Sequence, residues 1–294
     1  MRPIHFVDKS RSTYVQNGLN RICEILNGRG VTAGWCDKVV DAPEGAILVV
    51  HDPVEIDQIP LGCSVLGQRT LNRRERLILA EQSDLPVPAW GSLDDSDRFS
   101  DLLDEWDLDV LLHKADWSYA RKGVQARCRG DTIDRNSFDP NTDVFMQMIQ
   151  GGSYHTYKVD MYFDQIIGCR YVYTYHPQHE MFHKKFSQYS KQRELPGLSQ
   201  QLETLGRAVM AHGVGLSGVD IMVDVNDRSW VIELNTSSVG RESTWQRWPD
   251  IYINNYAQGI LKWLNEGSDA TFCTDRSPLV HLLTARSGGI DVRT

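Results

Sequence analysis

The stretch of residues 218–235 constrains the fold of this chain more than any other part of the sequence. It contains two runs rich in apolar residues, joined by a polar turn at residues 226–228, and this pattern predicts a β-hairpin. Asp220 opens the first strand, while Glu233 and Asn235 lie two residues apart on the second strand and therefore on one face. Pairing of the strands would gather three oxygen donors, the ligands that a hard cation such as Mg²⁺ prefers. The alternative is an exposed hairpin with ordinary surface acids.

Composition and charge restrict the class of protein. Of the 294 residues, 41% are hydrophobic and 24% are charged, as in a globular chain with a sizeable core. The net charge of −8 argues against a general binder of nucleic acid or of anionic membranes, because neutralising phosphates requires a basic face. No apolar run approaches the ~20 residues of a membrane span, and the first residues lack the apolar core of a signal peptide. We therefore expect neither nucleic acid nor membrane as a partner.

The cysteines and histidines do not form a recognisable metal or disulfide framework. The six cysteines are scattered and include no Cys-x-x-Cys pair, which favours reduced thiols in a cytoplasmic enzyme. His176, His179 and His183 lie close together, but Pro177 interrupts any helix that would present them together. The sequence therefore does not favour a zinc hydrolase.

The order of the predicted elements divides the chain into three domains. Residues 1–66 alternate short apolar strands with an amphipathic helix, as in a small α/β unit, and a charged helix follows at residues 71–82. The motif Leu-Pro-Val-Pro at residues 85–88 marks a boundary, because proline ends regular structure. The predicted domains comprise residues 1–85, 86–152 and 153–294. Residues 267–294 show too little pattern for a more detailed prediction.

Lys114 ends a predicted strand, and a turn at Gly123 follows nine residues later. A lysine in this place can put its ammonium group on the α- and β-phosphates of a nucleotide while the turn covers them. Arg121 and Lys122 lie in the same loop and would add cationic phosphate donors. An exposed turn with a solvated charge pair is the alternative.

A strand predicted at residues 144–149 is rich in methionine. Met146, Met148 and Ile149 would enclose a purine, because adenine sites need flat apolar walls and a few backbone hydrogen bonds. The alternative is that the two methionines fill gaps in the core.

These motifs, in this order, resemble those of the ATP-grasp superfamily. The approach to Asp220 is similar to the superfamily's Gly-x-x-Gly-Val-Asp segment, and the 13-residue step to Glu233 and the Glu-x-Asn of residues 233–235 match its metal-binding hairpin. The similarity is closest to the branch that includes the glutathione synthetases and the enzymes that ligate amino acids to peptides or proteins. It implies an α/β (α+β) ATP-grasp fold, in which a small N-terminal α/β domain precedes two antiparallel-sheet subdomains that bind the nucleotide between them.

The resemblance also assigns roles to individual residues. Asp220, Glu233 and Asn235 would hold Mg²⁺ on ATP, with two ions expected and Mn²⁺ as a substitute. Lys158 would lie near the γ-phosphate, and Arg241 would hold the acceptor carboxylate or an acylphosphate, which makes both candidates for catalysis. The positions implied to contact ATP are Lys114, Arg121, Lys122, Gly123, Gln147, Met148, Ile149, Lys158, Lys184 and Lys185.

Two departures from the superfamily pattern concern loops. After Lys114, the chain has Ala115 where proline is usual, and Ser118 and Arg121 where glycines are usual, which makes the loop stiffer. The small-residue loop at residues 236–240 is one residue longer than the superfamily's Pro-Gly loop, and this leaves the identity of the acceptor open.

The resemblance implies an ATP-dependent carboxylate–amine ligase. A carboxylate of an amino acid or peptide would attack the γ-phosphate to form an acylphosphate, and an amine would then displace phosphate. A homodimer is the expected assembly. Two alternatives remain: a kinase of the same fold that phosphorylates a small-molecule hydroxyl, which the charge of −8 disfavours for anionic substrates, and a non-catalytic nucleotide-binding protein, which the glycine-poor loop favours.

Five further residues have two interpretations each. Asp8, His51 and Asp52 follow predicted strands of the N-terminal unit, where open α/β sheets bind substrates, but such residues are also common as helix caps and in turns. Trp245 and Trp248 would form either a wall of the acceptor site or part of the core beneath the last helix.

Overall fold

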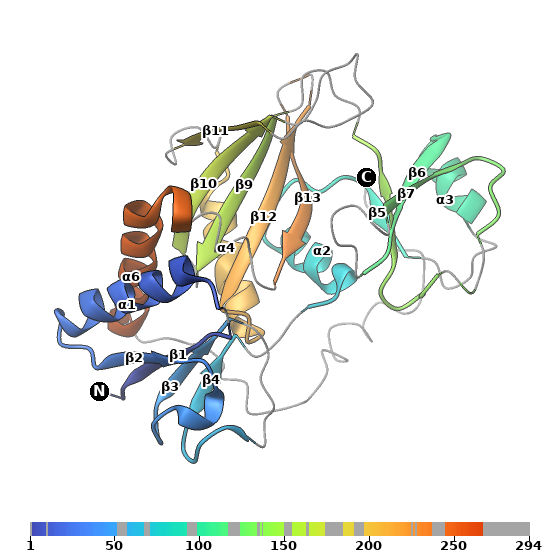
Figure 1. Cartoon of the computed structure of the whole chain (residues 1–294). Coiled ribbons are helices and arrows are strands. Elements are labelled where there is room, and N and C mark those ends of the chain that lie inside the picture. Colours follow the sequence, from blue (N-terminus) through green and yellow to red (C-terminus); the bar gives the residue numbers. More distant parts are fainter. Residues whose placement is uncertain are drawn as a thin grey trace.

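A computed structural model of the chain contains three β-sheets with helices packed between and around them (Figure 1). Among the residues that it describes, no helix is long and apolar enough to cross a membrane. The described residues are 2–9, 11–51, 58–67, 71–92, 99–116, 124–133, 136, 138–149, 155–162, 165–173, 185–190, 197–224, 226, 228–236 and 245–266.

The N-terminal strands form a parallel sheet in the order β2-β1-β3-β4. Parallel sheets need cover on both faces. Helix α1 (Thr13–Asn27) packs on the face that carries Ile4 and Phe6, and the short helix η1 (Val39–Asp41) packs on the face that carries Leu48 and Val50. The strands are β1 (Ile4–Val7), β2 (Ala33–Cys36), β3 (Ile47–Val50) and β4 (Ser64–Leu66).

The middle of the chain forms a small antiparallel sheet in the order β5-β8-β6-β7. Helix α3 (Phe99–Glu105) packs on one face, where Leu103 meets Leu111 and Phe145. The other face carries Lys114 and Met146, because side chains alternate along each strand. The strands are β5 (Trp90–Gly91), β6 (Val110–Lys114), β7 (Val124–Cys128) and β8 (Val144–Gln147).

The C-terminal strands form a large antiparallel sheet in the order β11-β10-β9-β12-β13. Helices α2 (Arg73–Gln82) and α4 (Ser199–Ala211) cover the face that carries Val159 and Val219. Helix α2 also packs Leu77 against the small sheet, so it lies between the two antiparallel sheets (Figure 1). The strands are β9 (His155–Tyr162), β10 (Gln165–Tyr173), β11 (Lys185–Ser190), β12 (Leu216–Val223) and β13 (Ser229–Asn235).

Helix α6 (Pro249–Glu266) packs on both the parallel sheet and the large sheet. Tyr252 crosses β10 at Gly168 and donates a hydrogen bond of 2.8 Å from its hydroxyl to Oδ2 of Asp160 on β9. Trp245, just before the helix, is buried against Gly18 of α1, so it belongs to the core. Each of the three predicted domains contains one sheet, while α2 and α6 pack across the predicted boundaries.

Tyr252 of α6 packs directly against Gly168 of the large sheet. A Cβ atom at this position would lie 2.2 Å from a ring carbon of Tyr252, whose hydroxyl is held by Asp160. We therefore expect Gly168→Ala to lower the free energy of unfolding by about 3 kcal/mol, at the upper end of the usual cost of overpacking. Gly259→Ala in α6 is the matched control, because its Cβ would meet Gln165 at an ordinary 3.5 Å. It should stabilise the helix by about 0.5 kcal/mol. Equal urea midpoints for the two variants would contradict this account.

Candidate active site

The predicted hairpin forms, and its acids meet on one face of the large sheet. Asp220 on β12 lies directly opposite Glu233 on β13, and Gly218 lies opposite Asn235. The register shifts between Asp220 and the next residue, so Ile232 is an extra residue on β13. The bulge leaves Glu233 and Asn235 on the same face as Asp220, so the register places the three predicted donors on one face of the hairpin.

Lys158 extends this row of side chains onto β9. It pairs in register with Asp220, and its Nζ lies 2.5 Å from Oδ2 of that carboxylate. The lysine is about one quarter exposed and the aspartate about one seventh exposed. Lys158, Asp220 and Glu233 therefore place one cation and two carboxylates side by side on a partly exposed surface, which a polyanion and a divalent cation could both reach.

Lys114 approaches the hairpin from the small sheet. Its side chain is almost fully buried, and Nζ donates a hydrogen bond of 3.0 Å to the backbone oxygen of Ile232, the bulged residue. Burial lowers the pKa of Lys114 to about 8; Arg73 adds to the shift, while Glu233 and Asp220 oppose it. A buried ammonium with a lowered pKa would gain from an incoming anionic phosphate.

Arg73 was not anticipated from the sequence as a member of the site. It is the first residue of α2, and its Nη2 lies 3.6 Å from Oε1 of Glu233. Burial lowers the pKa of Arg73, and the carboxylate of Glu233 acts against that shift. A basic first turn places cations at the positive end of the helix dipole, which is unfavourable unless an anion binds there. Arg73 and Arg76 in this turn were the signal that could have revealed this part of the site.

The expected purine-binding residues lie in different environments. Met146 is buried under Leu77 of α2, which favours its interpretation as a core residue, whereas Met148 is 37% exposed. Gln147 pairs with Leu111, so its side chain lies on the α3 face of the small sheet, opposite the face of Lys114. Ile149 lies two residues beyond the end of β8 and is partly buried.

Several predicted positions cannot be placed. Lys185 begins β11 at the edge of the large sheet, but the structure describes only its backbone. The remaining predicted positions lie outside the described residues; these are Arg121, Lys122, Gly123, Lys184 and Arg241.

The donor chemistry at the hairpin fits Mg²⁺. Two carboxylates and one amide supply only oxygen ligands, as a hard cation prefers. The part of the chain that the structure describes contains no group of three His, Cys, Asp or Glu residues placed to hold a metal, and so offers no softer site. The two acids are paired here with Lys158 and Arg73, which balance their charge.

Asp8 and His51 form a buried chain with α6 and leave no surface for a substrate. Nδ1 of His51 lies 2.6 Å from Oδ2 of Asp8, and its Nε2 lies 2.5 Å from the hydroxyl of Tyr256. Both the Asp8 and the His51 side chains are essentially unexposed. These contacts link the parallel sheet to α6, so Asp8 and His51 belong to the core and form neither a substrate site nor a turn; Asp52 lies outside the described residues.

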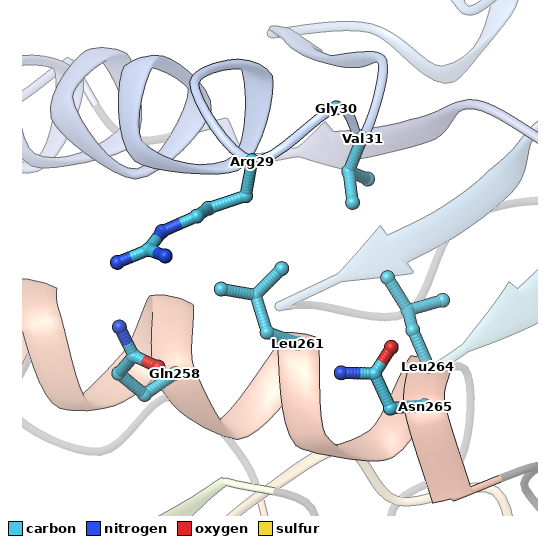
Figure 2. Close-up of a pocket in the computed structure, with 7 residues that line it drawn as sticks. All are labelled: Arg29, Gly30, Val31, Gln258, Leu261, Leu264 and Asn265. Atoms are coloured by element: carbon cyan, nitrogen blue, oxygen red, sulfur yellow. The ribbon is translucent and has the colours of Figure 1, made fainter.

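A shallow cavity of about 330 Å³ lies between the end of α1 and the last turns of α6 (Figure 2). Arg29 reaches across it toward Gln258, and Leu261 and Leu264 supply apolar walls. Its lining includes no carboxylate and no residue of the hairpin, so it is separate from the candidate active site.

Comparison with solved structures shows that the chain has the ATP-grasp fold, as the sequence predicted. The ATP-grasp ligase PsnB, in complex with a minimal precursor, matches with a TM-score of 0.59 and 15% identity over 89% of this chain and 99% of PsnB. The D-cycloserine synthetase DcsG matches at 0.57 and 12% identity over 89% and 99% of the two chains. The macrocyclase MdnC from Microcystis aeruginosa, bound to its precursor peptide MdnA, matches at 0.54 and 11% identity over the same shares. No family model and no curated protein matches the sequence.

Proposed function

We propose that this chain is an ATP-dependent carboxylate–amine ligase. The observation that carries the proposal is that Asp220 and Glu233 lie directly opposite each other beside Lys158, with Lys114 reaching the same hairpin from the facing sheet. This arrangement suits phosphoryl transfer, which needs charge neutralisation and in-line positioning more than covalent help from the protein.

Each charged group has a distinct task in this proposal. Asp220, Glu233 and Asn235 would hold two Mg²⁺ ions, for which Mn²⁺ can substitute, and Mg²⁺ would neutralise charge on the phosphates when bound. Lys114 and Arg73 would contact phosphate oxygens from the buried side, because both are desolvated cations at the hairpin. Lys158 would leave Asp220 and turn to the γ-phosphate once a metal ion takes over that carboxylate.

The proposed acceptor of the phosphoryl group is a carboxylate of an amino acid or peptide, which then reacts with an amine as an acylphosphate. Support for a peptide comes from PsnB and MdnC, which were both solved with precursor peptides. DcsG, a synthetase of a small molecule, supports an amino acid instead. Arg241 is proposed to hold the acceptor, because it closes the loop after the metal hairpin in the sequence.

Trapping the activated carboxylate tests this function. The protein is incubated with Mg-ATP and pools of amino acids or acidic peptides, with and without hydroxylamine, and ADP and hydroxamate are measured. We expect ADP release that depends on the carboxylate, together with hydroxamate. ADP release without hydroxamate but with a phosphorylated hydroxyl would support the kinase. ATP binding without ADP release from any pool would support a non-catalytic nucleotide-binding protein.

A further inference from the structure

The side chain of Arg76 bridges the two antiparallel sheets. Its Nη1 donates a hydrogen bond of 3.0 Å to the backbone oxygen of Leu234 on β13, and its Nη2 lies 2.9 Å from Oδ1 of Asp116, just beyond β6. Leu234 lies between Glu233 and Asn235 in the sequence. One guanidinium therefore contacts the metal hairpin on one side and, on the other, the segment that follows Lys114.

Asp116 is anchored on its other sides as well. The same Oδ1 accepts a hydrogen bond of 2.5 Å from the backbone N–H of Arg73 at the start of α2, where the helix dipole favours a negative charge. The backbone N–H of Asp116 donates to Oδ1 of Asp143 at 3.3 Å, and Oδ2 of Asp143 lies 3.0 Å from Nε2 of His113. Asp116, Asp143 and His113 are all buried. The end of β6 that carries Lys114 cannot shift without breaking these contacts.

Backbone groups along the outer edge of β13 are bonded by Arg76 and by two neighbouring segments. The backbone N–H of Val231 donates to the oxygen of Pro86 at 2.7 Å, Ile232 accepts from Lys114, and Leu234 accepts from Arg76. Lys114 of the small sheet, Arg76 of α2 and the connection between α2 and β5 thus occupy hydrogen-bonding groups that an edge strand would leave free. A buried ion pair is weak evidence for stability in general, but it can specify position.

From this geometry we infer that Arg76 and Asp116 are a pair of positioning residues that set Lys114 against the metal hairpin. Neither residue needs to touch the nucleotide. The consequence for ATP rests on the proposed function, whereas the bridge between the two sheets does not. Displacements of about 1 Å can cost on the order of 100-fold in rate, so a rigid bridge at this point has a clear use.

Arg76→Lys is the sharpest test, because lysine keeps the positive charge but lacks the two terminal nitrogens with which the guanidinium reaches the Leu234 oxygen and Asp116. In the full chain we expect the Kd for Mg-ATP to rise about tenfold, which corresponds to the loss of one such contact. Arg74→Lys on the same turn is the matched control and should leave Kd within about twofold, because Arg74 makes no part of this bridge. Asp116→Asn should weaken binding similarly, and the double variant should be no weaker than the single variants, because either change already breaks the bridge.

Two measurements distinguish a positioning role of Arg76 from a role in stability alone. A lowered Tm for Arg76→Lys with an unchanged Kd for Mg-ATP would overturn the inference. Amide hydrogen exchange measured without nucleotide is a test that does not depend on the proposed function. The backbone amides of β6 and β13 should exchange faster in Arg76→Lys than in the wild type, and their rates should not change in Arg74→Lys. If the wild type fails to bind ATP but this difference persists, the proposed function fails and the bridge stands. Equal exchange in both variants would refute the bridge itself.

Discussion

Glu233→Gln is expected to lower carboxylate-dependent ADP release about 1,000-fold, at the upper end of what loss of one preorganised electrostatic group costs. Glutamine keeps the size of the side chain and one oxygen, but it removes the charge that would hold a divalent cation between β12 and β13. Glu233 is also the carboxylate beside Arg73. Without it, Arg73 loses an ion-pair partner that would compete with phosphate, so metal-free ATP should bind as tightly as in the wild type or more tightly.

Two measurements on the same variant separate these effects. Initial rates of ADP release across a Mg²⁺ titration report the metal site, and calorimetry with ATP in EDTA reports the phosphate site. Glu24→Gln, an exposed change of the same kind on α1, is the control and should match the wild type in both. Retention of more than about a tenth of the rate by Glu233→Gln, with an unchanged Mg²⁺ dependence, would remove this residue from the proposed metal site.

The hairpin could be predicted from sequence because its geometry is local. A short polar turn sets the register of β12 and β13, and the alternation of side chains then decides which residues share a face. The long elements are also recognisable from periodicity, which predicts a strand at residues 165–173 and helices at residues 196–211 and 251–264. The strand β10 has the predicted bounds, and α4 and α6 begin and end within three residues of them. The strands β2, β4, β5, β7 and β11 were not predicted, because several are only two to five residues long and show too little alternation.

The surroundings of Lys114 could not be predicted in the same way. The contact between Arg76 and Leu234 joins residues 158 positions apart, and it depends on how α2 packs between two sheets. The sequence showed only that α2 is strongly charged. Arg73 and Arg76 in its first turn, opposed to the helix dipole, have a physical meaning only once Glu233 and Asp116 are known to lie beside them.

Burial decided between interpretations that the sequence left open. Asp8 and His51 stand where either a substrate contact or a turn residue was expected, and Trp245 stands where either an acceptor wall or a core contact was expected. All three are buried in packing between the N-terminal elements and α6. Such contacts arise from tertiary packing between segments that are distant in the sequence, so no local sequence pattern predicts them.

The pH dependence of ATP binding is the second large effect that we expect, and it follows from Lys114. Burial lowers the pKa of this lysine to about 8 in the free protein. Above that pH the free protein loses the ammonium charge, whereas bound phosphate would favour the charged form and raise the pKa again. ATP binding is then coupled to protonation of Lys114, so the affinity for ATP is highest well below pH 8 and declines as the pH rises above it. The Kd for ATP in EDTA should rise about tenfold between about pH 7.5 and pH 9.

Lys114→Arg isolates this titration, because arginine stays protonated throughout the range. The Kd of the Lys114→Arg variant for ATP should change little over the same pH interval, even if this Kd differs in magnitude from that of the wild type. The phosphate groups titrate near pH 6, below the window, and do not contribute to the slope. Calorimetry in buffers of different ionisation enthalpy would also count the proton, with close to one taken up by the wild type at pH 9 and none by Lys114→Arg. Equal slopes in the two proteins would show that Lys114 does not face the phosphates.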